Sequence, residues 1–287
     1  KVRRDGKHIY AAGRDDDAVA VLSRNSTRGE LTFVEVEKDG VGGVDGLDCA
    51  HSVTVSPDGK HIYPAGTFDH AVAVFSRNLT TGELTFVEVE RDGVGGVDGL
   101  GFAISVTVSP DGKHIYAAGQ LDDAVAVFSR NPTTGELTFV QVVKDGVGGV
   151  DGLLRNSSVT VSPDGKHLYA ASRDDDAVAV FSRDSTTGEL TFVEVEKDGE
   201  GGVDGLDHAW SVTVSPDGKH LYAAGVLDDA VAVFNRNPTT GELTFVEVQK
   251  DGVGGVDGLD AAWSVTVSPD GKHLYAAGAN DDAVAVF

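Results

Sequence analysis

The chain is a succession of short segments in which apolar and polar residues alternate. Within one stretch, four such segments of five to eight residues are rich in Val, Thr and Phe: Ser211–Ser215, His220–Ala224, Ala230–Arg236 and Leu243–Lys250. Alternation with a period of two predicts β-strands, and the intervening Pro, Asp, Asn and Gly residues predict turns. No segment carries the helical period over a useful length. The pattern therefore predicts an all-β chain of short antiparallel strands.

This four-strand pattern recurs every 53 residues. The stretches Ser158–Trp210 and Ser211–Trp263 differ at only nine of their 53 positions. A fixed period of this size indicates a repeat architecture, in which each unit buries its faces against its neighbours. We therefore expect one domain that spans residues 1–287. Its repeats are 1–51, 52–104, 105–157, 158–210, 211–263 and 264–287.

Four short antiparallel strands in each repeat are typical of the blade of a β-propeller. The first repeat has only a stub of its innermost strand, at Lys1–Val2, and the last stops before its outer strand. We expect a six-bladed β-propeller of four-stranded antiparallel blades; the alternative is a seven-bladed propeller with part of the chain missing. Because an unpaired strand edge favours association, we expect Ala283–Phe287 either to stay exposed or to pair with a partner strand. Self-association through this edge of the last blade is the expected consequence.

The differences among the repeats are concentrated in two connections. One joins the second and third strands, and the other ends just before the innermost strand of the next repeat. Because strand direction alternates, both connections are expected on the same face. Their aromatic, His and Arg side chains suit a ligand pocket. The predicted ligand-binding residues are Arg14, His51, Phe68, His70, Phe102, Arg155, Arg173, His208, Trp210 and Trp263.

Charge and composition narrow the choice of partners. Acidic residues outnumber basic ones by 46 to 23, which gives a net charge of −23. Such a surface repels phosphate backbones and anionic lipids, so nucleic acid is not an expected partner. No apolar run approaches the roughly 20 residues that span a bilayer, so membrane insertion is not expected. A small molecule or a glycan is the expected partner. The acidity and the single cysteine, Cys49, favour a secreted or cell-surface bacterial protein.

The histidines and aspartates give no clear metal site. Three histidines are unique to their repeats, and no two of them share a metal-ligand spacing. The Asp-rich loops match neither an EF-hand nor a GGxGxD coil, and Asp-Gly is ordinary turn chemistry. We predict no cofactor and no metal site, with calcium as the one candidate ion. Six other histidines occupy one equivalent position per repeat and are interpreted as structural: His8, His61, His114, His167, His220 and His273.

The repeat also resembles a known family. The segments VSPDGKHLYAAG, AVAVF and GELTFV recur in this order and are similar to the repeats of YVTN-type and 6-phosphogluconolactonase-like β-propellers. The resemblance covers essentially the whole chain. It implies a propeller, commonly of seven blades, in a family some of whose members hydrolyse or form lactones. Those enzymes place single, non-repeated polar residues around the axis, and no such motif is matched here, so we predict no catalytic residue.

Three functions remain open at this point. The favoured one is a non-enzymatic binding, interaction or scaffold propeller, with carbohydrate as the candidate ligand, because the variable residues are expected on one face. The alternative implied by the resemblance is a lactonase-like hydrolase or isomerase. The third is an engineered or structural repeat protein without a ligand, which the near-identical repeats and the absence of methionine favour.

Overall fold

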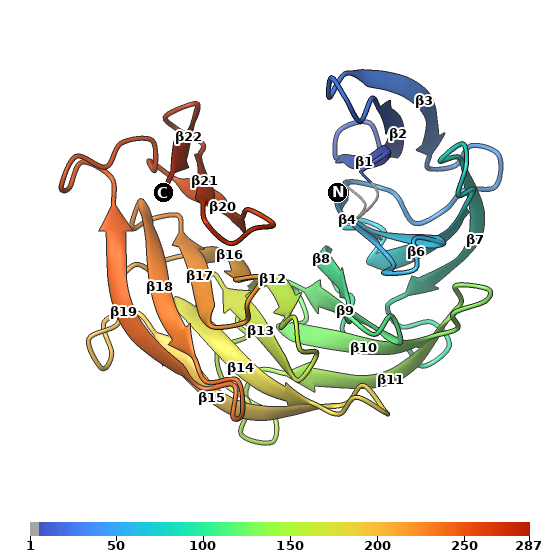
Figure 1. Cartoon of the computed structure of the whole chain (residues 1–287). Helices are drawn as coiled ribbons and strands as arrows, with labels where there is room; N and C mark the ends of the chain where they lie inside the picture. Colours follow the sequence, from blue (N-terminus) through green and yellow to red (C-terminus); the bar gives the residue numbers. More distant parts are fainter. Residues whose placement is uncertain (1–5) are drawn as a thin grey trace. The chain divides into compact units, whose positions relative to one another are not determined.

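The fold consists of β-strands joined by turns. The computed structural model describes residues 6–287, and their strands assemble into six antiparallel sheets (Figure 1). The protein is therefore an all-β, six-bladed propeller, as predicted. Residues 6–287 contain no helix, and hence none long and apolar enough to cross a membrane. The predicted strand stub at Lys1–Val2 lies outside the described residues.

The chain separates into two compact halves, residues 1–142 and 143–287. The expectation of a single domain that spans both halves stays a prediction. The N-terminal half contains three blades, with strand orders β1-β2-β3, β4-β5-β6-β7 and β8-β9-β10-β11. The strands are β1 (His8–Gly13), β2 (Ala18–Arg24), β3 (Leu31–Lys38), β4 (Ala50–Val55), β5 (His61–Gly66), β6 (Ala71–Arg77), β7 (Leu84–Arg91), β8 (Ala103–Val108), β9 (His114–Gly119), β10 (Ala124–Arg130) and β11 (Leu137–Lys144).

The C-terminal half also contains three blades, with strand orders β12-β13-β14-β15, β16-β17-β18-β19 and β20-β21-β22. Its last blade has three strands, as predicted. The strands are β12 (Asn156–Val161), β13 (His167–Ser172), β14 (Ala177–Arg183), β15 (Leu190–Lys197), β16 (Ala209–Val214), β17 (His220–Gly225), β18 (Ala230–Arg236), β19 (Leu243–Lys250), β20 (Ala262–Val267), β21 (Leu274–Gly278) and β22 (Ala283–Val286).

Two of the four predicted strands, β18 and β19, have the predicted limits, and β17 extends one residue further, to Gly225. The innermost strand of the fifth blade, β16, begins at Ala209, two residues before the predicted start at Ser211. Its pairing with β17 skips one residue between these two positions. Trp210 is therefore the extra residue of a β-bulge. The alternation within one strand cannot reveal such an insertion, because a bulge is a property of two paired strands.

Successive blades bury their faces against each other. The segment from Ala177 to Phe181 in β14 is buried at every position, so both faces of this strand are covered. One apolar cluster joins Tyr169 and Val178 of the fourth blade to Leu221 of the fifth. A strand that is buried on both faces has a nearly continuous apolar sequence, which explains the AVAVF segments of this chain. This packing is the main source of the hydrophobic stabilisation of the fold.

A buried arginine also connects successive blades. Arg130, at the end of β10, donates from Nε to the Tyr63 hydroxyl at 2.7 Å and from Nη1 to the Gly112 carbonyl at 2.8 Å. Its Nη2 lies 2.7 Å from His61 Nδ1 and 3.0 Å from a carboxylate oxygen of Asp58. The planar guanidinium thus finds partners on both blades, which a buried cation requires. We call this arrangement the interblade arginine cluster.

The same cluster recurs at two other interfaces. Arg236 contacts Tyr169, His167 and Asp164, and Arg77 contacts Tyr10 and His8. The structural interpretation of the repeated histidines is therefore confirmed at these three interfaces. Burial, followed by the charge of Arg130, lowers the pKa of His61, which keeps the ring neutral and its Nδ1 able to accept a hydrogen bond.

Candidate functional site

The variable residues before each innermost strand occupy a repeated backbone distortion. His208 has a φ of 55°, Ala209 is buried, and Trp210 is the bulge residue. A positive φ is unusual for a residue other than glycine, and such positions and β-bulges are both frequent at functional sites. The equivalent positive-φ residues are Cys49, Phe102, Arg155 and Ala261, and the equivalent bulge residues are His51, Ile104, Ser157 and Trp263.

Hydrogen bonds from the neighbouring loops hold this distortion. The His208 backbone N–H donates to Asp176 Oδ1 at 2.9 Å, and the His208 carbonyl accepts from the Val226 N–H at 3.1 Å. Asp176 and Val226 belong to the connections between the second and third strands of the fourth and fifth blades. The same contact joins Thr67 N–H to the Cys49 carbonyl at 3.2 Å. The prediction that the two variable connections share one face is therefore confirmed within each half.

In the C-terminal half these connections gather charged side chains. Asp174 lies between two arginines, with its oxygens 2.7 Å from Arg173 Nε and 3.8 Å from Arg155 Nε. Two residues further along the same loop, Asp176 contacts His208. One loop therefore contacts two arginines through Asp174 and one histidine through Asp176. We call Arg155, Arg173, Asp174, Asp176, Asp207 and His208 the His208 cluster.

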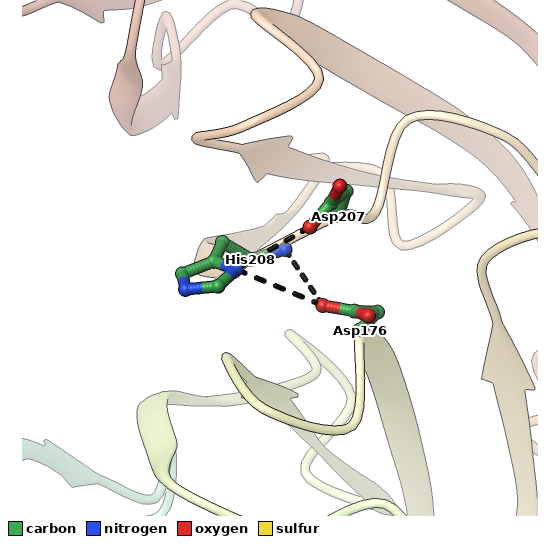
Figure 2. A group of neighbouring side chains, drawn as sticks. All are labelled: Asp176, Asp207 and His208. Atoms are coloured by element: carbon green, nitrogen blue, oxygen red, sulfur yellow. Dashed lines mark hydrogen bonds and ion pairs between the residues drawn. The ribbon is translucent and has the colours of Figure 1, made fainter.

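The His208 ring is oriented by carboxylates (Figure 2). Its Nδ1 lies 3.3 Å from Asp207 Oδ1 and 3.9 Å from Asp176 Oδ1. Figure 2 shows the opposite edge of the ring, which carries Nε2, facing away from both carboxylates. A carboxylate at Nδ1 favours the tautomer with the proton on that nitrogen, which leaves Nε2 free to accept a proton. The side chain is 35% exposed, so a substrate can reach it.

An aromatic pair lies on the strands that follow. Trp210 on β16 and Trp263 on β20 have ring centroids 4.3 Å apart, with planes inclined by 53°. Trp263 is 41% exposed. Aromatic rings exposed in this way offer an apolar surface with one polar N–H, which suits the C–H face of a small polar ligand.

The remaining predicted residues belong to the N-terminal half. The Phe68 and Phe102 rings lie 5.4 Å apart, and Phe68 is 54% exposed. The Phe102 N–H donates to His70 Nδ1 at 2.7 Å, so His70 takes the place that an aspartate has in the other repeats. Burial of the His51 ring, together with the nearby charge of Arg14, lowers the pKa of His51. Arg14 itself is exposed, 3.9 Å from Asp15. The structure thus sorts the ten predicted residues into two groups of five, one in each half.

The acidic loops do form carboxylate groups, but side-chain cations bind them. Asp198, Asp204 and Asp228 each place a carboxylate oxygen within 4.8 Å of the other two. Lys250 Nζ contacts Asp204 and Asp228, each at 2.8 Å. Lys197 similarly binds Asp151 at 2.9 Å. A protein ammonium group therefore occupies the place that calcium would take in these repeats, and we assign no metal to them.

Sequence reasoning missed the acidic members of the His208 cluster. Asp174, Asp176 and Asp207 belong to the Asp-rich loops that the sequence offers to calcium, and none of them is among the predicted ligand-binding residues. The signal that could have identified their role is the adjacency of Asp207 to His208 in the chain. Repeated scaffold residues become site residues where a variable histidine or arginine stands beside them.

The chain is similar to lactonases over nearly its whole length. The family profile described as "Lactonase, 7-bladed beta-propeller" matches residues 1–98, 105–256 and 212–287. A 6-phosphogluconolactonase from Klebsiella pneumoniae (strain 342) is 26% identical over 233 residues, covering 80% of this chain and 63% of that relative. The chain thus spans less than two thirds of that relative's length.

Two solved structures are also similar to this chain. A structure from Bacteroides uniformis matches 99% of this chain and 79% of its own, with a TM-score of 0.77 and 24% identity. The periplasmic gluconolactonase PpgL of Pseudomonas aeruginosa matches 88% of this chain and 69% of its own, with a TM-score of 0.68 and 25% identity.

Proposed function

Because the chain belongs to the lactonase family of 7-bladed β-propellers, we propose that it hydrolyses the lactone of a sugar acid at the His208 cluster. The observation that carries this proposal is the placement of His208 against Asp207 and Asp176, on the same loop system as Arg155 and Arg173. A base, its orienting carboxylate and a cation are the parts that ester hydrolysis uses.

The earlier preference for a non-enzymatic binding propeller is wrong. The matching family profile, the Klebsiella pneumoniae relative and the Pseudomonas aeruginosa structure are all described as lactonases, which supports the enzymatic alternative. The error has a physical source. The side chains that would hydrolyse a lactone at this site meet from separate loops, so their spacing along the chain does not reveal them.

The proposed reaction begins with a water molecule between His208 Nε2 and the lactone carbonyl. Nε2 accepts a proton as the water oxygen bonds to the carbonyl carbon, while Asp207 stabilises the resulting imidazolium through Nδ1–H. The bond between the carbonyl carbon and the ring oxygen then breaks. The imidazolium returns the proton to that oxygen, and the product is the open-chain hydroxy acid.

The arginines and tryptophans supply binding and charge stabilisation in this proposal. A guanidinium donates several hydrogen bonds in one plane, so Arg155 or Arg173 suits the oxyanion and the carboxylate product. The exposed face of Trp263 suits the C–H face of the sugar ring. The net charge of −23 weakens long-range attraction of a phosphorylated lactone, which favours an uncharged gluconolactone as the first substrate to test.

We also propose that the protein acts outside the cytoplasm. The relative from Pseudomonas aeruginosa that matches most of the chain is described as periplasmic. Cell fractionation of the source organism tests this location independently of activity.

The proposal is tested by following acid release from glucono-δ-lactone and its 6-phosphate in a pH-stat, with spontaneous hydrolysis subtracted. His208→Asn is the informative variant, because Asn tolerates a positive φ better than most residues. We expect kcat to fall by about 10²- to 10⁴-fold, the usual contribution of a general base. Asp207→Asn is expected to lower kcat less, with KM unchanged.

Ala261→Asn is the matched control, since it makes the same type of change at the equivalent position of the next repeat, where φ is 53°. It should leave both constants unchanged. Turnover of neither lactone by the wild type, or equal rates for wild type and His208→Asn, would remove the proposal.

A further inference from the structure

An exposed aromatic pair lies on the variable loops of the second and third blades, in the N-terminal half. The Phe68 and Phe102 rings have centroids 5.4 Å apart, with planes inclined by 55°, and Phe68 is 54% exposed. Leu121 on the next loop is 49% exposed, and its N–H donates to the Gly101 carbonyl at 2.9 Å. Together with His70, whose ring centroid is 6.4 Å from that of Phe102, these residues form what we call the Phe68 surface.

This surface carries fewer carboxylates than the equivalent regions of the other repeats. His70 stands where the five other repeats have aspartate, and Gly101 stands where three of them have aspartate. The aspartates equivalent to His70 are Asp17, Asp123, Asp176, Asp229 and Asp282, and those equivalent to Gly101 are Asp48, Asp207 and Asp260. Without these charges, the surface does not repel the lone pairs of a ligand oxygen.

The aspartates that remain beside the surface already have partners within the protein. Asp69 Oδ1 lies 2.8 Å from Arg91 Nη1, and Asp69 Oδ2 accepts from the Asp48 N–H at 2.9 Å. Asp122 Oδ2 accepts from the Gly101 N–H at 2.7 Å. These two carboxylates therefore serve to hold the loops in place.

The backbone fixes His70 as a hydrogen-bond donor. The Phe102 N–H donates to His70 Nδ1 at 2.7 Å. A ring nitrogen that accepts a hydrogen bond carries no proton, so the neutral imidazole has its proton on Nε2. No hydrogen bond from Nε2 is described among residues 6–287. His70 thus differs from His208, whose Nε2 is the accepting nitrogen, and it offers an N–H beside the aromatic pair.

We propose that the Phe68 surface binds an uncharged aromatic ligand that carries a carbonyl oxygen. The ligand ring packs against Phe68 and Phe102, which offer apolar area and ring contacts without a polar group of their own. The carbonyl oxygen accepts from His70 Nε2–H, and this single polar contact sets the orientation of the ligand. The inference goes beyond the proposed lactonase activity and does not depend on it.

The test is a fluorine NMR titration of the protein with para-fluoroacetophenone, an uncharged ring with one carbonyl. Binding should saturate at one molecule per chain. The corresponding ethyl compound, which lacks the oxygen, should bind about threefold to tenfold more weakly, as for loss of one hydrogen bond. The para-fluorophenyl trimethylammonium ion should also bind more weakly. Tighter binding of this cation would show that the net charge of −23, and not His70, selects the ligand, and would overturn the proposal.

Two substitutions of His70 separate its donor role from its contact with the backbone. His70→Asp restores the residue of the other repeats and keeps an acceptor for the Phe102 N–H, but it replaces the donor by a carboxylate, so binding should weaken about tenfold or more. His70→Asn keeps both an acceptor and an N–H donor and tolerates the φ of 51°, so binding should change by less than about threefold. Equal effects of the two substitutions would refute the donor role.

A second pair of variants locates the site. Phe68→Ala removes an exposed ring and should weaken binding of para-fluoroacetophenone about tenfold. Leu227→Ala is the matched control, because Leu227 occupies the equivalent position of the fifth repeat and is 59% exposed. It should alter binding by less than about twofold. Absence of saturable binding to the wild type, or equal effects of Phe68→Ala and Leu227→Ala, would each rule out the Phe68 surface as the binding site.

Discussion

Removing one hydroxyl from the interblade arginine cluster should loosen the contact between the second and third blades. The Tyr63 hydroxyl is buried, accepts from Arg130 Nε at 2.7 Å and donates to the Gly135 carbonyl at 3.0 Å. Burial raises the pKa of Tyr63 to about 12 despite the nearby Arg130, so the hydroxyl keeps its proton at all ordinary pH values. Tyr63→Phe preserves the ring packing and removes both hydrogen bonds.

The expected loss of stability follows from the two groups that lose their hydrogen bond to Tyr63, the Arg130 guanidinium and the Gly135 carbonyl. A hydrogen bond to a charged group contributes about 1.5–3 kcal/mol, and an orphaned buried carbonyl adds about 1 kcal/mol. We therefore expect the free energy of unfolding to fall by about 3 kcal/mol. With an unfolding entropy of about 2.1 cal/mol/K per residue over 287 residues, Tm should fall by about 5 °C.

Calorimetry and chemical denaturation of the two proteins measure this change, and the chain contains its own control. Tyr222→Phe makes the same substitution at the equivalent position of the fifth blade, where no hydrogen bond to the hydroxyl is described among residues 6–287. It should shift stability by less than about 0.5 kcal/mol. If Tyr63→Phe were as mild as Tyr222→Phe, the cluster would not contribute to cohesion between blades, and the reasoning would fail.

Two further predictions concern the same interfaces. Burial would raise the pKa of Asp58, but Ser56, the Lys60 N–H and Arg130 lower it to about 2, so its stabilising contribution is present above pH 3.8 and is lost as pH falls toward 2. Denaturant midpoints at pH 5 and pH 2.5 should therefore differ less for Asp58→Asn than for the wild type, and equal differences would contradict the assignment. Gly241→Ala should destabilise more than Gly252→Ala, because both have positive φ but only the first would place a Cβ 2.3 Å from the His167 ring. Thermal melts should show a loss of about 1–2 kcal/mol for Gly252→Ala from φ alone, and a further 1–3 kcal/mol from the clash at Gly241; equal losses would show that the ring moves aside freely.

The fold could be predicted from the sequence because its information is local and repeated. Alternation in Ala230–Arg236 and Leu243–Lys250 predicts two strands at the limits that β18 and β19 have. The interblade arginine cluster could not be predicted in this way. Arg236 and His167 are 69 residues apart, which is one repeat of 53 plus an offset that depends on how one blade packs on the next. No pattern within a strand contains that offset.

The candidate site was predicted in part. Arg155, Arg173 and His208 were recognised because they depart from the repeat, whereas Asp176 and Asp207 were not recognised as their partners. Variation within the chain marks residues that differ between repeats, whereas aspartate recurs at most positions equivalent to Asp176 and at two positions equivalent to Asp207. Their role depends on a contact across 32 residues, from Asp176 to His208, that only the folded chain reveals.

Just before each innermost strand, the backbone conformation is held independently of the side chain that it carries. At position 208 the backbone is anchored by the carboxylate of Asp176, whereas the side chain of residue 208 takes no part in that anchor. The same backbone accordingly accepts thiol, phenyl, guanidinium, imidazole and methyl groups, at Cys49, Phe102, Arg155, His208 and Ala261. New ligand specificities can therefore arise by replacing single side chains at these five positions, with little loss of folding stability.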